Sequence, residues 1–469
     1  LSGTGGLTKS GTGTLFLSGT NTFTGVTTLS AGTLSLSGIT NGGVAGPLGA
    51  ATNAAANLVF GAGTLQYTGG TVSMNRNFTL TTGTTSSVYV TSAETDLTLS
   101  GASTNTTGGL NKAGAGQLVI TGANLHTGLT NVQAGTLAYG ANNALSNGAV
   151  QVSGGVLDLK TFNDTVGAVT LASGSITGST GVLTGASYAV QSGSISAILA
   201  GAVALNKTTT GTAILSGANT YTGVTTVSAG TLRATTSDNA LGAGAASLTL
   251  AGGILEWAND TGLDFARNTT LSANSTVNSD VLTLGAAGVT HSLGTLTMTG
   301  QTLTIGSGST VGSGTAGITF DAVAVNGGAV TTTFNADTGS LLTLGSVTPA
   351  GAGAKVIAFG GNGDTTVSGV ITDASGASTA SVTKSGNGTL ILANANLYDA
   401  ATTISAGIVR AKNNTALGTT AAGSSVTGGA TLELDGTAGP LTVGAEALTL
   451  NGTGILSGGS LRNIKGNNS

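Results

Sequence analysis

Hydrophobic residues alternate with small polar residues along most of this chain. A clear example is Leu34 and Leu36 on either side of Ser35, whereas Leu15 and Leu17 keep the same spacing around Phe16. Alternation over short runs predicts β-strands, because successive side chains of a strand point to opposite faces. Gly, Asn and Ser bound these runs, and they are typical of turns. The pattern therefore predicts an all-β protein with almost no α-helix.

One stretch occurs four times without insertion. The sequence "GTLFLSGTNTFTGVTTLSAGTL" begins at Gly13, and its copies begin at Gly116, Gly211 and Gly388. We interpret the Asn and Gly of each copy as corner residues, because both tolerate positive φ. The aligned positions are Lys9, Lys112, Lys207 and Lys384, then Asn21, Asn124, Asn219 and Asn396, and finally Gly32, Gly135, Gly230 and Gly407.

A shorter period lies inside each copy. The "GTL" triplet at Gly13 recurs at Gly32, and the other three copies repeat this step. A step of this length suits one turn of a β-solenoid, in which two or three short strands meet at Gly and Asn corners. Neighbouring turns then stack at about 4.8 Å through backbone hydrogen bonds. We expect about 19 residues per turn plus loops, and about 20–24 turns.

We predict one continuous solenoid over residues 1–469. The fourth unit is degenerate, because "GTLTMTG" from Gly294 resembles "GTLFLSG" from Gly13 but lacks the portion that follows. The predicted units are 7–109, 110–204, 205–287, 288–381 and 382–469.

Composition restricts the classes of function. Only 6% of the residues are charged and the net charge is −4, so there is no basic stripe for nucleic acid. The chain contains no cysteine, which excludes disulfides and thiolate metal sites. The best candidate for a membrane segment, "ISAILAGAVAL" from Ile195 to Leu205, is too short to span a bilayer. We expect no nucleic-acid partner, no membrane-spanning segment and no cofactor.

The chain has two histidines, and we interpret both as packing residues. His126 occupies the position that Phe23, Tyr221 and Tyr398 hold in the other copies, so a flat ring there is structural. His291 has no acidic or histidine neighbour in sequence with which to form a catalytic or metal site.

The densest acidic cluster is Glu256, Asp260 and Asp264, in "LEWANDTGLDFARN". These carboxylates are the candidates for binding Ca²⁺ or for acid–base work on a glycan. The matching stretch "LQYTGGTVSMNRN" from Leu65 carries no acid, which favours a non-catalytic interpretation. The "GGNGD" sequence at Gly360 is similar to a calcium-binding repeat, but it occurs once and lacks a spacer residue. We therefore predict no catalytic, cofactor-binding or metal-binding residues.

The four copies resemble the autotransporter-associated β-strand repeat, also called the passenger-associated transport repeat. The resemblance rests on one stretch in each copy, such as "GTGTLFLSGTNTFTGVTTLSAGTL" from Gly11. It implies a right-handed parallel β-helix that is exported to the surface of a Gram-negative-type bacterium. It implies no catalytic residues, because the repeat itself contains none.

Two hypotheses for function follow. The first is a non-catalytic structural or adhesive repeat segment of a bacterial surface protein, which forms a rod, stalk or fibre. The alternative is a polysaccharide-binding or polysaccharide-degrading β-helix, for which the acidic cluster would supply the carboxylates. Both ends resemble interior sequence, so we expect the solenoid to associate with itself along its axis or to continue in a longer chain. Contacts with surfaces or glycans are also expected.

Overall fold

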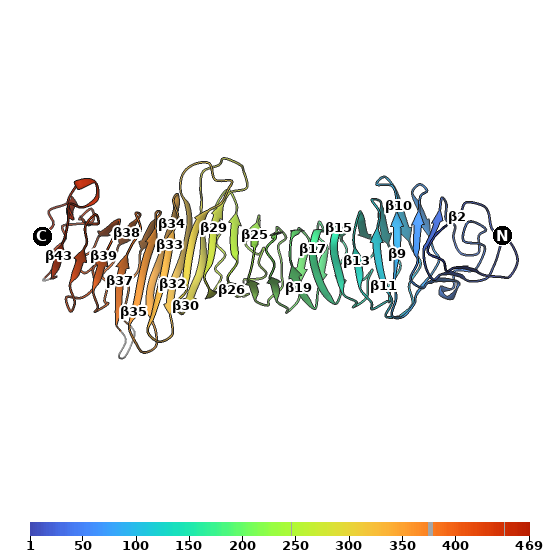
Figure 1. Ribbon diagram of the computed structural model, residues 1–469, viewed down its shortest axis with the longest axis horizontal. Helices are drawn as coiled ribbons and strands as arrows, with labels where there is room; N and C mark the ends of the chain where they lie inside the picture. Colours follow the sequence, from blue (N-terminus) through green and yellow to red (C-terminus); the bar gives the residue numbers. More distant parts are fainter. Residues whose placement is uncertain (245, 374–378, 445) are drawn as a thin grey trace. The chain divides into compact units, whose positions relative to one another are not determined.

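The computed structural model describes residues 1–244, 246–373, 379–444 and 446–469. It contains two compact units, Leu1–Gly223 and Val224–Ser469. In each unit short strands lie side by side and belong to successive turns of a solenoid (Figure 1). The described residues contain two single turns of 3₁₀-helix, η1 (Ala55–Asn57) and η2 (Ile455–Ser457), and no α-helix. The all-β solenoid predicted from the sequence is thus confirmed.

The strands are short, and most of them lie on successive turns. The first unit contains β1 (Leu7–Lys9), β2 (Thr14–Leu17), β3 (Thr27–Leu29), β4 (Thr33–Leu36), β5 (Leu58–Phe60), β6 (Thr64–Tyr67), β7 (Val72–Met74), β8 (Thr79–Leu80), β9 (Thr85–Val90), β10 (Asp96–Leu99), β11 (Gly109–Ala113), β12 (Gln117–Ile120), β13 (Thr130–Val132), β14 (Thr136–Tyr139), β15 (Val150–Asp158), β16 (Asp164–Thr165), β17 (Ala168–Thr177), β18 (Val182–Thr184), β19 (Ser187–Val190), β20 (Gly193–Ile195), β21 (Ile198–Ala200), β22 (Leu205–Lys207) and β23 (Thr212–Leu215). The second unit contains β24 (Thr225–Val227), β25 (Thr231–Thr235), β26 (Leu248–Ala251), β27 (Ile254–Ala258), β28 (Thr269–Ala273), β29 (Ser275–Asp280), β30 (Thr290–Met298), β31 (Thr302–Ser307), β32 (Ala316–Val325), β33 (Val330–Ala336), β34 (Ser340–Pro349), β35 (Lys355–Gly361), β36 (Asp364–Val367), β37 (Ala380–Lys384), β38 (Thr389–Leu392), β39 (Thr402–Ile404), β40 (Ile408–Ala411), β41 (Ser424–Val426), β42 (Thr431–Asp435), β43 (Leu448–Leu450) and β44 (Leu461–Lys465).

The core of each unit consists of columns of aliphatic side chains stacked in register. In the first unit β10, β12 and β14 pair in parallel and place Leu97, Leu118 and Leu137 opposite one another. All three side chains are fully buried, while the residues just before them are partly exposed. The alternation in the sequence therefore distinguishes the side chains on the inner face of the solenoid wall from those on its outer face.

The length of a turn depends on whether it lies inside the repeat. Thr14 pairs with Thr33, and Thr389 pairs with Ile408, so turns inside the copies keep the step between the two "GTL" triplets. Elsewhere the advance is longer, as in the pairing of Thr302 with Thr333, because loops extend the corners. The described residues make about 19 turns, slightly fewer than expected. One solenoid through the whole chain, divided into five units, stays a prediction.

The aligned glycines lie at corners where one turn approaches the next very closely. Gly32, Gly135, Gly230 and Gly407 have φ values of 65°, 60°, 61° and 70°. A Cβ atom on Gly135 would lie 2.7 Å from the carbonyl oxygen of Ala115, in the preceding turn. A side chain at this corner would thus meet both an unfavourable backbone conformation and a backbone clash.

We predict that Gly135→Ala destabilises the protein much more than Gly83→Ala. Gly83 has a similar φ of 73°, but a Cβ atom there would meet nothing within 4 Å. The control should lose about 1 kcal/mol of unfolding free energy through backbone strain alone. Gly135→Ala should lose about 2 kcal/mol more, because the turns must separate. Chemical denaturation of both variants measures the difference, and equal losses would contradict the close-approach explanation.

Candidate functional site

The lysines of the repeats are buried, and their ammonium groups bind backbone carbonyls at the corners. The Lys112 Nζ donates to the carbonyl oxygens of Ala113 (2.8 Å), Gly114 (2.9 Å) and Ala134 (2.9 Å), and its side chain is fully buried. Ala134 belongs to the following turn, so one ammonium group links two turns. Burial lowers the pKa of Lys112 to about 8, while the three carbonyl acceptors favour the charged form.

The same contact recurs in other copies. The Lys9 Nζ donates to the carbonyl of Ala31 (3.1 Å), and the Lys384 Nζ donates to that of Gly386 (2.7 Å). Burial also lowers the pKa of Lys384 to about 8. A further buried lysine, Lys355, lies outside the copies and donates to the carbonyl of Gly327 at 3.0 Å. These buried lysines therefore hydrogen-bond to corner carbonyls inside the protein and do not form an exposed basic surface.

The four aligned asparagines are buried and connect successive turns through their side-chain amides. In the second unit the Asn396 Oδ1 accepts from the backbone N–H of Ile371 (2.8 Å), and its Nδ2 donates to the carbonyl of Ala416 (2.6 Å). These two partners lie in the preceding and the following turn. In the first unit the Asn124 Nδ2 donates to Ala144 at 3.1 Å in the same way. Asn21 and Asn219 are likewise buried.

His126 lies inside the wall with both ring nitrogens next to hydroxyl groups. Its Nδ1 lies 3.3 Å from the Ser103 Oγ, and its Nε2 lies 3.0 Å from the Thr130 Oγ1. Tyr398 occupies the equivalent position, and its hydroxyl lies 2.6 Å from the Oγ1 of Thr402, again four residues later. Burial lowers the pKa of His126 to about 4. The ring thus fills the same position as the tyrosine.

His291 is also fully buried. Its Nδ1 accepts from the backbone N–H of Leu263 at 3.0 Å, and its Nε2 lies 3.3 Å from the carbonyl oxygen of Asp280. These contacts place the proton on Nε2. Burial lowers the pKa of this ring, so it is held neutral.

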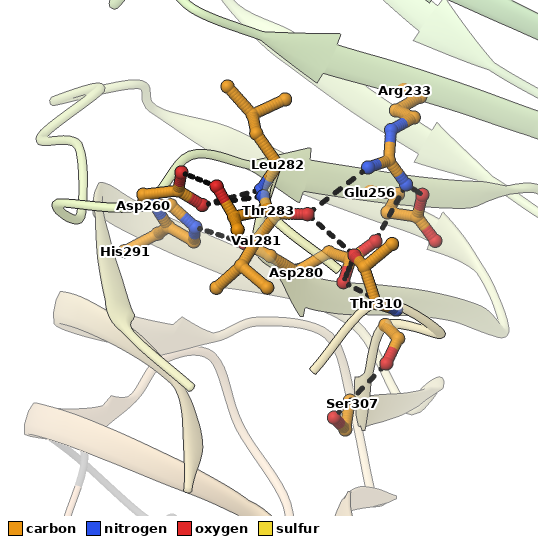
Figure 2. Close-up of polar contacts among 11 residues, drawn as sticks. Arg233, Glu256, Asp260, Asp280, Val281, Leu282, Thr283, His291, Ser307 and Thr310 are labelled. Carbon is orange, nitrogen blue, oxygen red and sulfur yellow. Dashed lines mark hydrogen bonds and ion pairs between the residues drawn. The ribbon is translucent and has the colours of Figure 1, made fainter. Parts of the chain in front are cut away.

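The acidic cluster expected from the sequence has separate partners in the structure. Glu256 forms an ion pair with Arg233, whereas Asp260 accepts from the backbone N–H groups of Leu282 (2.7 Å) and Thr283 (3.0 Å). Figure 2 shows Glu256 and Asp260 turned toward these different partners. Asp264 accepts from its own loop, at the N–H of Ala266 (3.1 Å). Each of the three carboxylates therefore binds either nearby backbone N–H groups or the Arg233 guanidinium.

Side chains of the "GGNGD" stretch also form hydrogen bonds with the following turn. The Asp364 Oδ1 accepts from the N–H of Thr389 at 2.8 Å, and the Asn362 Oδ1 accepts from the Asn387 Nδ2 at 3.1 Å. In the part of the chain that the structure describes, no group of three or more His, Asp or Glu side chains is arranged to hold a metal ion.

The second unit contains a cluster of charged side chains of which the sequence analysis singled out only Glu256. Arg233 on β25 forms ion pairs with Glu256 on β27 and with Asp280 at the end of β29, the latter at 2.6 Å (Figure 2). The Asp280 side chain is fully buried, and it also accepts from the hydroxyl and the N–H of Thr310. We call Arg233, Glu256, Asp280 and Thr310 the base cluster.

The base cluster keeps the Asp280 carboxylate ionised. Burial alone would raise the pKa of Asp280, but hydrogen bonds from Thr310 and Val281 and the Arg233 guanidinium outweigh it and lower that pKa.

A signal for the Arg233–Glu256 pair was present in the sequence. Arg410 and Glu433 stand 23 residues apart, as Arg233 and Glu256 do, and they occupy the equivalent place in a later copy. They also form an ion pair, at 2.8 Å. No comparable signal identified Asp280 or Thr310.

Three loops meet above the base cluster, and we call residues 259–268, 281–289 and 308–315 the lobe. These loops join strands near β29, where Figure 1 shows loops extending beyond the strands. Gly285 donates to the carbonyl of Thr310 at 2.8 Å, and Gly288 donates to that of Ser313 at 2.8 Å, so the turn-to-turn ladder continues into the lobe. Leu282 and Leu284 are 44% and 81% exposed. The lobe therefore presents aliphatic side chains on an ordered support.

Comparison with known proteins identifies the repeat. The profile of the passenger-associated-transport-repeat matches residues 7–36, 110–138, 205–234 and 382–411. The chain thus carries four copies of this repeat, as the resemblance in sequence predicted. It is also similar to the protein named Adhesin BmaC autotransporter from Brucella suis biovar 1 (strain 1330), with 32% identity.

The alignment covers 98% of this chain but 14% of the adhesin, so the chain spans about a seventh of that relative. No solved structure matches the chain. No helix among the described residues is long and apolar enough to cross a membrane.

The parent chain should lose unfolding free energy as the pH falls from 6.5 to 4, and we predict that His126→Tyr removes this loss. The unfolded histidine has a pKa near 6.5 and the folded one about 4, so the unfolded state binds the proton first. Above pH 6.5 the His126 ring makes its full contribution to the free energy of unfolding. As the pH approaches 4, this contribution falls by up to about 3 kcal/mol. Tyrosine occupies the same position in two other copies and has no such titration.

Unfolding midpoints of the variant and the parent chain at pH 7 and pH 4.5 test this prediction. Asp164 titrates in the same window with opposite sign, because burial raises its pKa to about 6. The difference between the two proteins isolates His126 from that contribution. An identical pH dependence in both would refute the assignment.

We predict that Arg233→Met destabilises the lobe far more than Arg410→Met. Removing Arg233 leaves the buried Asp280 carboxylate without its cation, which should cost about 3 kcal/mol. Removing Arg410 leaves Glu433 with a second cation, Arg462 at 3.5 Å, and should cost less than about 1 kcal/mol. Hydrogen exchange of residues 281–289 and 308–315 should accelerate only in Arg233→Met. Unchanged exchange there would show that the base cluster does not hold the lobe.

Proposed function

We propose that this chain is a non-catalytic structural and adhesive segment of the passenger of a bacterial surface protein. The observation that carries the proposal is the placement of its reactive side chains. The buried lysines, asparagines and histidines form hydrogen bonds with backbone groups or with neighbouring hydroxyls inside the solenoid wall. Glu256, Asp260 and Asp264 are occupied by a cation or by backbone N–H groups. The chain thus uses its polar chemistry to hold the solenoid together.

The similarity to an autotransporter adhesin and the four passenger repeats support a location on the cell surface. The repetitive wall supplies length and stiffness, and the lobe supplies a local contact with exposed aliphatic side chains. Growth of the array along its axis, within one chain or between chains, belongs to this proposal. The alternative of a polysaccharide-degrading enzyme gains no support from the acidic cluster, because its three carboxylates do not share a partner.

An adhesion assay on cells that carry the full surface protein tests the proposal. In-frame deletion of residues 1–469 should lower adhesion with the protein still displayed on the surface. Leu282→Ser with Leu284→Ser should lower adhesion at least about fivefold, since exposed aliphatic anchors are removed. Phe16→Ser is the matched control, because Phe16 is 74% exposed but lies outside the lobe.

Surface quantity, measured with an antibody to another part of the protein, separates adhesion from export. Full adhesion after deletion of the segment would refute the adhesive role. Release of new reducing ends from acidic glycans, with or without calcium, would instead support the enzyme alternative.

A further inference from the structure

Two hollows lie at equivalent corners of the second unit. The first has a volume of about 400 Å³ and is lined by Asn387, Ser405, Ala406, Gly407, Gly428, Gly429, Gly454, Ile455 and Leu456. The second has a volume of about 240 Å³ and is lined by Gly252, Gly253, Ile254, Asn274, Ser275, Thr276, Thr302 and Thr304. Each crosses several successive turns, and each includes a pair of adjacent glycines.

The strand register shows that the two corners correspond. β25 pairs with β27 through Thr231 and Ile254, and β40 pairs with β42 through Ile408 and Thr431, so the chain advances equally in both places. The glycine pairs precede β27 and β42 at the corner that follows the "SAG" turn of a repeat. Both hollows therefore lie at the same corner of the turn, although their linings differ. Ser405, Ala406 and Gly407 of the "SAG" turn line only the first hollow, together with Gly454, Ile455 and Leu456 from the loop around η2.

The chemistry of both hollows is polar and uncharged. None of the lining residues is ionisable, and hydroxyl and amide side chains contribute from Asn387, Ser405, Thr302 and Thr304. Hydroxyl and amide groups act as both donor and acceptor, as sugar hydroxyls do. Leu456 adds an aliphatic surface at the first hollow, where its side chain is 97% exposed on η2. The volume of the first hollow lies within the range of about 300–1,000 Å³ typical of small-ligand sites.

The backbone beside the first hollow does not favour a peptide ligand. Recognition of an extended peptide by strand addition needs unpaired backbone groups at a sheet edge. Here the N–H groups of Ser405, Thr427 and Asn451 already donate to the carbonyls of Lys384, Ile404 and Val426 in the preceding turns, at 2.9–3.0 Å. The Asn387 Nδ2 and the Ser405 Oγ already donate to the Asn362 Oδ1 and the Lys384 carbonyl oxygen. What this corner offers to a ligand is therefore the remaining hydrogen-bonding capacity of these side chains, and not a free strand edge.

We propose that these two corners are repeated binding sites for a neutral polysaccharide. Each site is shallow and binds one segment of the polymer weakly. Two sites on one chain then raise the affinity for a long polymer through the local concentration of the second segment. This inference rests on the adhesive function proposed above and identifies a partner for it.

Calorimetric titration of the full chain tests the proposal. The probes are cellohexaose, mannohexaose and maltohexaose, with hexagalacturonate as a charged oligomer of equal length and an uncharged Ser/Thr-rich dodecapeptide. At least one neutral hexasaccharide should bind saturably and at least about tenfold more tightly than hexagalacturonate, because no cation in either hollow compensates a carboxylate. Its parent polymer should bind more tightly still.

Gly428→Leu is the variant that fills the first hollow. A Cβ atom on Gly428 would meet nothing within 4 Å, so the change should leave the fold intact and weaken hexasaccharide binding at least about fivefold. Gly328→Leu is the matched control, because Gly328 has the same open surroundings and lies outside both hollows. Thr304→Leu combined with Gly428→Leu should abolish the advantage of the long polymer over the hexasaccharide.

Absence of binding by all three neutral sugars would overturn the proposal, and so would equal binding by Gly428→Leu and the parent chain. Binding of the dodecapeptide alone would also overturn it and would indicate a peptide partner. These outcomes can be distinguished from a failure of the adhesive function proposed above. If deletion of the segment abolishes adhesion while no sugar binds, only the sugar sites are wrong. If sugars bind while deletion leaves adhesion unchanged, the adhesive function is wrong.

Discussion

The spacing between neighbouring turns determines most of this structure. Parallel strands hydrogen-bond across about 4.8 Å, so every corner must let the next turn approach to that distance. The corner glycines satisfy this requirement, because a Cβ atom on Gly32, Gly135 or Gly407 would overlap carbonyl groups of the turn before it. The small number of charged residues follows from the same constraint, since like charges stacked at this spacing repel one another. A sequence that looks almost featureless is thus restricted at these repeated corners.

Corners also interrupt the hydrogen-bond ladder, and buried side chains replace the missing partners. Buried backbone carbonyl and N–H groups need such partners, because leaving them unpaired is unfavourable. The lysine ammonium meets several carbonyls of two turns, as Lys112 does. The asparagine amide accepts from one turn and donates to the next, as Asn396 does. Polar residues that would ordinarily mark an exposed site are therefore part of the interior of this wall.

The sequence was sufficient to predict the wall, because its physics is local and periodic. Alternation of Leu with small polar residues indicated the strands, and the step from Gly13 to Gly32 indicated the turn. It did not predict the base cluster, because Asp280 at the end of β29 and Thr310 in a loop stand 30 residues apart in sequence and are brought together by turns of irregular length. The carboxylates of the acidic cluster have separate partners for a related reason. Residues close in sequence, such as Glu256 and Asp260, face different partners once a strand ends between them.

A solenoid of this kind separates the part that must stay constant from the part that can vary. An inward change in one turn disturbs the turns on both sides, because stacked residues such as Leu97, Leu118 and Leu137 share one column. A longer corner loop points away from that column and leaves the register of the strands unchanged. Short and long turns accordingly coexist, as the pairings Thr14 with Thr33 and Thr302 with Thr333 show. Variation in sequence and loop length is therefore expected at corners. The lobe and both hollows of the second unit lie at corners. The repeat supplies the frame, and the departures from the repeat provide the surfaces on which recognition can evolve.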